Sequence, residues 1–240
     1  MGANYADWPP MTRDQARYVK DIFERIAPRY DLMNRLMTGG QDLAWRREVI
    51  RRAGLYAGAR LLDLGAGTGD LGREALRQAP DCRPVLADFS LGMLRVGKSH
   101  PGPALSWSGA DALHLPFADE SFDAIVSGFL LRNVTNLQHA LGEQLRLLKP
   151  GRRMVALDTT RPVRSALSPL IWLHMHAVIP LLGWLLTGQR AAYRYLPNST
   201  ESFVRAEDLA VRMAAVGFRK VGFRRLNFGT IAIHWGEKAA

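Results

Sequence analysis

The sequence predicts an α/β protein with a doubly wound, mostly parallel sheet of seven strands. Between residues 59 and 160, short apolar runs alternate with amphipathic stretches, which is the pattern of a parallel sheet covered by helices. A glycine-rich turn follows the first apolar run, where such sheets bind ligands. The 240 residues, 48% of them hydrophobic, suffice for one such domain with additions.

A helical cap is expected over residues 1–56, ahead of the sheet. Within residues 12–30, the apolar side chains have the spacing of one helix face: Val19, Ile22, Phe23 and Ile26. Pro28 should end that helix. A second helix is predicted over residues 42–55 and should stop at Gly54. Such a helical segment could also pair two subunits into a homodimer.

The catalytic domain is expected over residues 57–240. Its predicted strands cover residues 59–65, 83–89, 104–110, 122–130 and 152–160. Its predicted helices cover residues 70–79, 91–99, 137–149 and 207–218. Two further strands, 220–227 and 229–238, have so short a connection that we expect an antiparallel hairpin at the sheet edge.

One apolar segment interrupts this alternation. Residues 166–188 contain no Asp, Glu, Lys or Arg, and their number approaches that of a membrane span. Pro169, Pro180 and Gly183 make the segment a poor span. We therefore predict an inserted, broken helical lid at about residues 163–200, which covers an apolar substrate or rests on a membrane. Ordinary core packing is the alternative.

The net charge of +10 is unevenly distributed along the chain. Residues 1–60 carry +4 and residues 150–240 carry +8, whereas the middle carries −2. Cationic flanks suit an anionic membrane surface or nucleic acid, and a merely arginine-rich surface is the alternative. Cys82 is the one cysteine, so no internal disulfide can form, and no signal-peptide pattern is visible. We expect a cytoplasmic protein at the inner face of the cytoplasmic membrane.

The glycine-rich turn is the first candidate ligand site. Asp63 ends the first strand, and Gly65, Gly67 and Gly69 follow at alternate positions before a helix, with Thr68 between them. Without side chains, this turn lets a ligand approach the main chain, and the helix start offers free N–H donors. The spacing is neither the dinucleotide fingerprint nor a P-loop.

Acidic residues follow the next two strands. Asp88 lies 19 residues after Gly69, where a carboxylate can accept hydrogen bonds from both ribose hydroxyls. Asp111 and Ala112 follow the third strand, and Asp111 could face an adenine amino group. A nucleoside site without phosphate-binding chemistry fits S-adenosylmethionine, whose sulfonium and ammonium groups suit an acidic turn. A domain with tight turns and no cofactor is the alternative.

Four stretches resemble a known family. The stretch "FERIAPRYDLMNRLMTGG" resembles the N-terminal signature of the ubiquinone/menaquinone biosynthesis C-methyltransferases, and "GFLLRNVTN" resembles their second signature. The stretches "RYLPNSTESF" and "GTIAIHWGEK" resemble their C-terminal segments. The resemblance runs from about Val19 to Lys238. It implies the Rossmann-like class I methyltransferase fold with S-adenosylmethionine as the cofactor.

The resemblance also implies a reaction. Members of this family methylate a ring carbon of a polyprenylated quinol, and we therefore expect conversion of demethylmenaquinol to menaquinol. A 2-polyprenyl-6-methoxy-1,4-benzoquinol of ubiquinone synthesis is the alternative substrate. An RNA methyltransferase is the alternative class, but the Asp/Asn-Pro-Pro-Tyr/Phe pattern and paired cysteines are missing and the 166–188 segment is apolar. We therefore expect no nucleic-acid partner. A quinone-binding scaffold without activity is a third hypothesis.

Catalytic roles follow from what this reaction demands. A ring carbon becomes nucleophilic when the adjacent hydroxyl loses its proton, so the site needs a base or a cation. Arg132 lies just beyond the fourth strand, and we assign it to polarising a water or stabilising the phenolate, since arginine hardly ever deprotonates. Asn133 would orient the ring, and Tyr30, with Asp31 and Asn34, would close over the cofactor and the ring. A salt bridge at a helix start is the alternative for Arg132.

The chain departs from the family pattern at several positions. Asp42 and Leu43 stand where relatives have a His-Arg pair, so any role of that pair is in doubt. Leu130 replaces a glycine, which would narrow the pocket, and Gly128 offers no side chain to the cofactor where relatives carry serine or glycine. The histidines show no metal-ligand spacing. His234 is expected to be a packed core residue, with a role as base as the weaker alternative.

Overall fold

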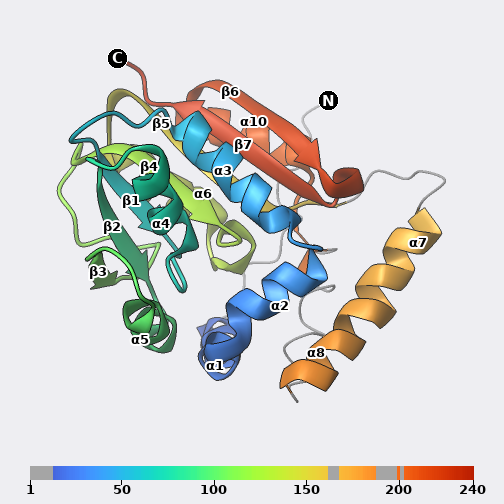
Figure 1. Cartoon of the computed structure of the whole chain (residues 1–240). Helices are drawn as coiled ribbons and strands as arrows, with labels where there is room; N and C mark the ends of the chain where they lie inside the picture. Colours follow the sequence, from blue (N-terminus) through green and yellow to red (C-terminus); the bar gives the residue numbers. More distant parts are fainter. Residues whose placement is uncertain (1–12, 162–167, 188–198, 201–202) are drawn as a thin grey trace, which may run out of the picture.

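Seven strands form one sheet in the computed structural model of this chain (Figure 1). The structure describes residues 13–161, 168–187, 199–200 and 203–240. The sheet order is β3-β2-β1-β4-β5-β7-β6. The strands are β1 (Arg60–Leu64), β2 (Arg83–Asp88), β3 (Ser106–Gly109), β4 (Phe122–Gly128), β5 (Leu148–Thr159), β6 (Arg219–Leu226) and β7 (Ile231–Glu237).

Strand directions confirm the predicted topology. The neighbours from β3 to β5 are parallel, whereas β7 runs antiparallel to both β5 and β6. The last two strands therefore form the predicted hairpin, with β6 at the edge. The carboxyl ends of the five parallel strands meet at one edge of the sheet, where α/β folds bind their ligands.

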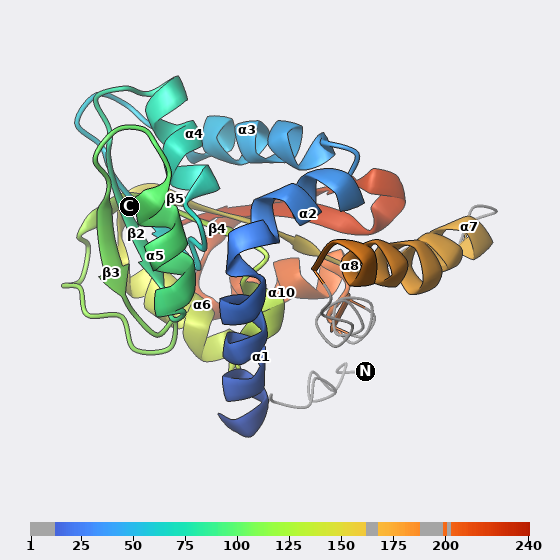
Figure 2. The same cartoon turned by 60° about the horizontal axis from the view of Figure 1, so that its bottom comes forward.

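Helices cover both faces of the sheet (Figure 2). The helices α3 and α4 pack with one buried cluster of strand residues, and α6 and α10 pack with the other. The helices are α1 (Arg13–Ile26), α2 (Tyr30–Met37), α3 (Gln41–Ala53), α4 (Asp70–Gln78), α5 (Leu91–Ser99), α6 (Leu137–Leu147), α7 (Ser168–Leu173), α8 (Ile179–Thr187) and α10 (Ala206–Val216). Short 3₁₀ turns are η1 (Ala27–Arg29), η2 (Leu131–Asn133) and η4 (Asn227–Gly229), and η3 (His174–Val178) is a π-helical turn.

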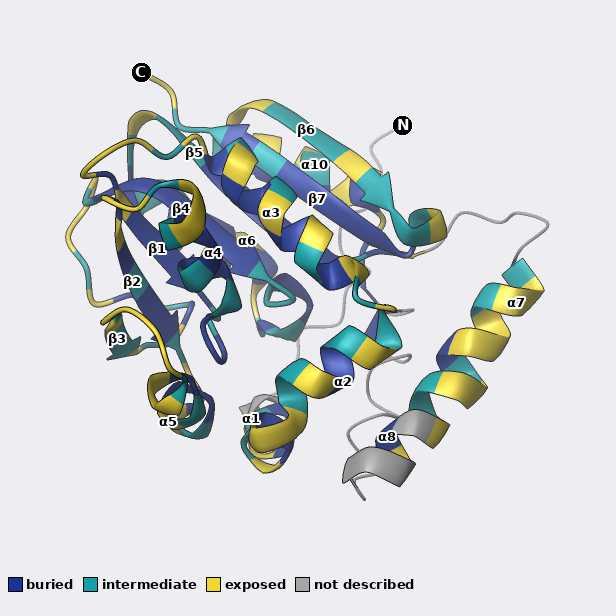
Figure 3. Ribbon diagram, in the orientation of Figure 1, coloured by how far each residue is buried: buried dark blue, intermediate teal, exposed yellow. Residues whose placement is uncertain are grey.

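The burial of the strands explains their sequence. In β4 every residue before Gly128 is buried, and β1 is buried after Arg60 (Figure 3). Strands covered on both faces need continuous apolar runs, in contrast to the alternation of a one-sided sheet. The apolar runs of the sequence therefore correspond to the centre of the sheet.

The N-terminal helices differ from the prediction. Pro28 does end α1, at Ile26, but it also lies in the first turn of η1, which leads directly into α2. A proline is tolerated at a helix start because its missing N–H would have no partner there. The predicted end of the first helix is therefore confirmed, whereas the separate helix α2, which begins at Tyr30, was not predicted.

The strand β5 begins earlier than predicted. It starts at Leu148, so Pro150 and Gly151 lie within the strand and do not terminate α6, which ends at Leu147. A register shift between Phe122 and Ala124 accommodates this irregular start. Gly151 has a φ of +71°, which glycine adopts without strain.

The apolar segment forms one helical rod of α7, η3 and α8, apart from the sheet and beside α2 (Figures 1 and 3). The remainder of the predicted 163–200 lid, apart from residues 199–200, lies outside the described residues. Across the described parts of the chain, no helix has both the length and the apolar character needed to cross a membrane. The division of the chain at residues 56 and 57 stays a prediction.

Candidate active site

A cavity of about 170 Å³ lies at the carboxyl ends of β1, β2 and β4. Eight residues predicted for the site line it: Tyr30, Gly65, Gly67, Asp88, Asp111, Ala112, Gly128 and Asn133. They come from α2 and from the carboxyl ends of four different strands and the segments that follow them. The topology thus brings together residues that are distant in the sequence. We call this the smaller cavity.

The glycine loop after β1 forms one wall of the smaller cavity. Gly65, Gly67 and Gly69 have φ values of +67°, +57° and +91°, a region that side chains disfavour. A Cβ atom on Gly65 would lie 2.9 Å from Cδ1 of Leu130, and one on Gly69 would lie 2.7 Å from a ring carbon of Trp107. Leu130 therefore packs directly on the loop, at the position where a glycine was expected.

Asp88 fixes the loop from the end of β2. Its Oδ2 accepts a hydrogen bond from the backbone N–H of Gly67 at 2.8 Å, and its Oδ1 accepts one from Ser90 at 2.7 Å. Burial raises the pKa of this carboxyl, and the backbone hydrogen bonds partly oppose that change. Each oxygen keeps a second lone pair for a ligand hydroxyl.

Asp63 lies beneath the loop, outside the lining of either cavity. Only 1% of it is exposed, and its Oδ2 accepts a hydrogen bond from Gly72 N–H at 2.9 Å. Its Oδ1 finds no hydrogen-bond partner among the described residues. Burial raises the pKa of Asp63 to about 7, and the nearby Asp88 adds to this effect. Thr68 and Gly69 also line neither cavity.

Asp111 contributes a more exposed edge. Its Oδ1 accepts a hydrogen bond from the backbone N–H of Leu113 at 2.9 Å, and nearly half of its side chain is exposed. Ala112, which follows it, is buried in the cavity wall. This edge therefore combines a fixed carboxylate with a small apolar residue.

A larger cavity of about 580 Å³ adjoins the smaller one. Both cavities are lined by Phe23, Tyr30 and Phe129. Nine further residues of its wall are apolar and come from α1, α2 and the lid helices with η3: Ile22, Ile26, Met33, Leu36, Met37, Leu170, Ile171, Met175 and Ile179. The larger cavity thus suits an apolar ligand placed beside whatever fills the smaller one.

Arg132 places a guanidinium in the wall of the larger cavity. It lies in η2 and is 4% exposed, and its Nη1 donates a hydrogen bond to Oδ1 of Asp158 at 2.6 Å. The backbone N–H of Arg132 donates to Oδ2 of the same carboxylate at 3.3 Å. The ion pair that was the alternative for Arg132 therefore exists, and it coexists with a place in the cavity wall.

Asp158 was missed in the sequence, although a signal was present. It is the penultimate residue of β5, at the sheet edge where Asp63 and Asp88 also end or nearly end their strands. Asp63 and Asp88, which also lie at the ends of apolar runs, were predicted as site residues, whereas Asp158 was not. Its partner could not be identified from spacing, because Arg132 lies 26 residues away.

Tyr30 and Asn133 differ in their surroundings. Tyr30 lines both cavities, and burial raises the pKa of its hydroxyl against the smaller opposing effect of Asn34. Asn133 lines only the smaller cavity, and its Nδ2 donates a hydrogen bond to the carbonyl of Phe129 at 2.9 Å. The role of Asn133 in orienting a ring in the larger cavity therefore stays a prediction.

His234 lines neither cavity. It is 1% exposed in β7, its Nε2 lies 2.9 Å from the carbonyl oxygen of Ala206, and its ring stacks on Phe223. Burial lowers its pKa to about 4. It is therefore packed in the core as expected, and its position gives no support to the alternative role as a base. Within the described part of the chain, no cluster of three or more His, Cys, Asp or Glu side chains could hold a metal ion.

The profile of the ubiE/COQ5 methyltransferase family matches residues 11–238. The chain belongs to this family. It is 43% identical over 221 residues to the ubiquinone/menaquinone biosynthesis C-methyltransferase UbiE of Desulfotalea psychrophila, covering 92% of this chain and 90% of that protein. It is also 43% identical over 220 residues to the demethylmenaquinone methyltransferase of Thermus thermophilus, covering 90% and 100% respectively.

Solved structures share the fold of this methyltransferase at low identity. The [4+2]-cyclase SpnF is 18% identical with a TM-score of 0.68, covering 94% of this chain and 97% of that chain. An S-adenosylmethionine-dependent methyltransferase of Thermotoga maritima is 18% identical with a TM-score of 0.63, covering 92% and 99%. These similarities confirm the class I methyltransferase fold.

The site fits the cofactor of the family, S-adenosylmethionine. The loop glycines leave no room for side chains and keep the main chain open to a ligand. Oδ1 of Asp63 is buried and has no hydrogen-bond partner in the described part of the chain, and Asp88 and Asp111 border the cavity. This acidic surrounding favours a ligand that carries a sulfonium and an ammonium group.

Proposed function

We propose that this enzyme methylates a ring carbon of a polyprenylated quinol, converting demethylmenaquinol to menaquinol. The observation that carries this proposal is the pair of adjoining cavities with Phe23, Tyr30 and Phe129 in their common wall. One cavity is acidic and glycine-lined, and the other is large and apolar with one buried guanidinium. The names of the Thermus and Desulfotalea relatives support a quinol substrate, and the former supports the naphthoquinol.

The smaller cavity would hold the cofactor. Gly65 and Gly67 give the main chain close access to it, Asp88 accepts the ribose hydroxyls, and Asp111 with Ala112 borders the adenine. Gly128 leaves space at the end of β4. Asp63, Thr68 and Gly69 would act from behind the cavity wall by holding the loop in shape.

The larger cavity would hold the quinol ring and part of its tail. S-adenosylmethionine supplies an electrophilic methyl group on its sulfonium. Arg132 would stabilise the phenolate that makes the ring carbon nucleophilic, because a guanidinium has further N–H donors beyond the one bonded to Asp158. Asp158 would hold that guanidinium in place. Tyr30, in the wall of both cavities, would align the ring with the cofactor.

The outer side of the lid supports contact with a membrane. Trp172, Leu173, Leu181 and Trp184 are 59%, 49%, 54% and 42% exposed, an unusual apolar surface for a protein in water. Residues of the same rod line the larger cavity from within. An enzyme resting on lipid through the lid could receive the tail of its substrate directly from the bilayer.

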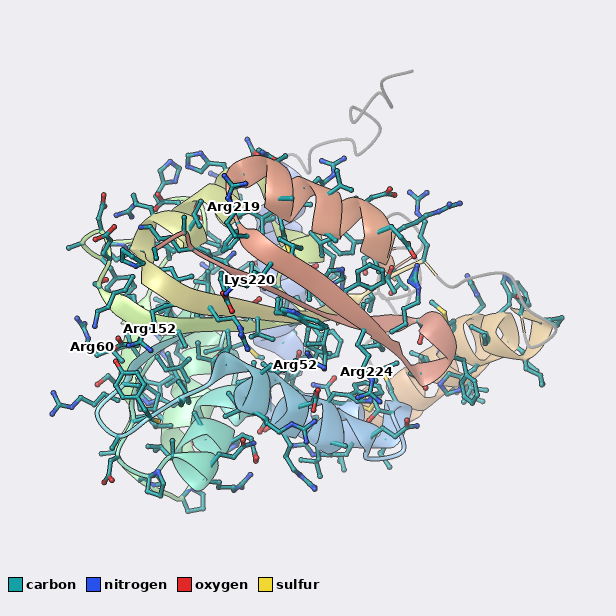
Figure 4. All side chains as sticks on the ribbon, turned by 90° about the horizontal axis from the view of Figure 1, so that it is seen from above. Arg52, Arg60, Arg152, Arg219, Lys220 and Arg224 are labelled. Atoms are coloured by element: carbon teal, nitrogen blue, oxygen red, sulfur yellow. The ribbon has the colours of Figure 1, made fainter. Side chains whose placement is uncertain are left out.

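Several basic side chains lie away from the lid. Figure 4 places Arg60, Arg152 and Arg219 at the end of the molecule opposite the lid. These residues lie at or near the amino ends of β1 and β5 and at the start of β6, away from the edge that carries the cavities. The proposed membrane contact therefore rests on the apolar lid more than on these charges.

The test is methyl transfer from labelled S-adenosylmethionine with three acceptors offered in parallel. Reduced demethylmenaquinone should gain one methyl group, detected by mass spectrometry, while total RNA should gain none. A 6-methoxy-benzoquinol acceptor should react more slowly than the naphthoquinol. Preferred methylation of the benzoquinol would overturn the choice of ring, and methylation of RNA alone would overturn the proposed function.

A further inference from the structure

The helix α2 presents two different faces to two different parts of the site. Tyr30, Met33, Asn34 and Met37 line the larger cavity, with the spacing of one helix face. Asp31 and Arg35, one turn apart, contact the cofactor loop instead. An eight-residue helix thus lies between the proposed quinol site and the proposed cofactor site.

Two hydrogen bonds join α2 to the loop. The hydroxyl of Thr68 donates to Oδ1 of Asp31 at 2.6 Å. Nη2 of Arg35 donates to Oδ2 of Asp70 at 2.9 Å. Thr68 and Asp70 flank Gly69 at the start of α4, so both contacts bind α2 to the segment that carries the positive-φ glycines. A shift of this segment should therefore also displace α2.

A buried charge network holds Arg35 from its other side. Arg35 also pairs with Asp42, which is fully buried. Arg46 donates to Oδ2 of Asp42 at 2.5 Å, and its Nε lies 3.2 Å from Oδ2 of Asp70. Two arginines and two aspartates therefore alternate, and their charges balance. Such a partly buried network of paired charges favours one geometry.

Asp42 acquires a role through this network. It stands at a position where the chain departs from its family pattern, and the sequence left its function in doubt. The structure shows Asp42 bonded to Thr38, Arg35 and Arg46, so it connects the end of α2 to α3. Asp42 thus holds Arg35 in the position from which its guanidinium contacts the loop.

We propose that Asp31 and Arg35 are positioning residues that couple occupation of the cofactor site to the shape of the quinol cavity. A cofactor that orders the glycine loop would fix α2 through Thr68 and Asp70. The opposite face of α2 would then hold Tyr30 in the cavity wall. Binding of either ligand should strengthen binding of the other by the same factor. The identity of the second ligand rests on the proposed function, whereas the linkage between loop and helix does not.

The first measurement needs no quinol. Amide hydrogen exchange of residues 30–37 is followed with and without S-adenosylhomocysteine. We expect this ligand to slow exchange in α2 by fivefold or more in the native protein and by less than twofold in Asp31→Asn. Asp21→Asn, an exposed carboxylate on α1, is the matched control and should behave as the native protein. Equal protection of α2 in Asp31→Asn would overturn the proposal.

The second measurement uses both ligands. A menaquinone with a short prenyl tail is titrated by calorimetry with and without S-adenosylhomocysteine. The ratio of its two dissociation constants should be about five or more in the native protein and about two in Asp31→Asn and in Arg35→Met, because each variant removes one of the two contacts between α2 and the loop. A ratio that stays unchanged in both variants would show that the ligands communicate directly through Tyr30, and would overturn the proposal.

A double-substitution cycle separates positioning from general damage. If Asp31 acts through the Thr68 hydroxyl, Asp31→Asn combined with Thr68→Val should lower the ratio no further than either change alone. Additive losses would overturn the proposed route. Failure of the proposed function would appear differently, as menaquinone that does not bind at all while S-adenosylhomocysteine still protects α2.

Discussion

Arg132 and Asp158 form an ion pair buried beside the larger cavity, with only 4% and 1% of their side chains exposed. Removing two charges from water is costly, and their attraction repays the cost only in good geometry. Here the pair makes a bidentate contact through Nη1 and the backbone N–H of Arg132. One carboxylate thus fixes both the side chain and the local backbone of the residue proposed to stabilise the phenolate.

Replacing Asp158 should therefore damage both folding and activity. We expect Asp158→Asn to lower the free energy of unfolding by about 3–5 kcal/mol, because it leaves the Arg132 charge buried without its partner. Methyl transfer by the remaining folded enzyme should slow at least tenfold. Urea unfolding and single-turnover assays measure the two effects.

A surface pair provides the matched control. Asp119 contacts Arg146 with 71% of its side chain exposed, so Asp119→Asn should change stability by at most about 1 kcal/mol. Equal stability of the two variants would contradict the proposed role of Asp158.

The buried carboxyl of Asp63 should make the free energy of unfolding depend on pH. Burial raises its pKa to about 7 in the folded protein from an ordinary value of 3.8, so the folded state holds a proton that the unfolded chain releases. The stability that Asp63 contributes is therefore fully present below about pH 4 and is lost as pH rises to about 7. The loss amounts to at most about 1.4 kcal/mol per pH unit.

The measurement compares the native protein with Asp63→Asn by urea unfolding from pH 5 to pH 8. The free energy of the native protein minus that of the variant should fall with rising pH up to about 7 and then level off. The buried His234 titrates in both proteins and cancels in this difference. A difference that stays constant over the whole range would show that Asp63 has an ordinary pKa.

At the scale of elements, the lid rod of α7, η3 and α8 is the most unusual feature. It is apolar on the side that lines the larger cavity and also on much of its outer side. A helix with apolar residues all round is stable only when both sides are covered. The cavity and its ligand would cover the inner side, and a bilayer surface would cover the outer side.

The exposed apolar side chains on the outer side of the lid predict that the protein binds membranes through the lid. We expect the protein to sediment with anionic liposomes more strongly at low salt than at high salt, because exposed basic residues add to the attraction. The double variant Trp172→Ser, Leu181→Ser should bind about tenfold more weakly at both salt concentrations, since it removes exposed apolar area.

The control for this loss is Val211→Ser, which removes an exposed aliphatic side chain from α10, a helix that packs on α6 and the C-terminal strands. It should bind liposomes as the native protein does. If it weakens binding as much as the lid variant does, the lid is not the contact surface. If no liposome binding occurs at either salt concentration, the membrane proposal fails.

At the scale of the whole molecule, the sequence predicted the sheet well. The seven strands, their mostly parallel direction and the C-terminal hairpin are confirmed, because continuous apolar runs and tight turns are local properties of the chain. The glycine loop and the acidic ends of β1 and β2 were found for the same reason. The end of α1 before Pro28 was predicted correctly, whereas Pro150 lies within β5 and does not end α6.

The sequence by itself determined which segments form strands, where the chain turns, and that an acidic, glycine-lined turn follows β1. Only the tertiary structure decided that Arg132 meets Asp158, that α2 joins the cofactor loop to the larger cavity, and that two cavities share a wall. The spacing of apolar residues along the chain indicates the environment of a residue only from neighbours a few positions away. Partners that lie 26 or 37 residues apart come together only through the order of the strands and the packing of helices across the sheet edge.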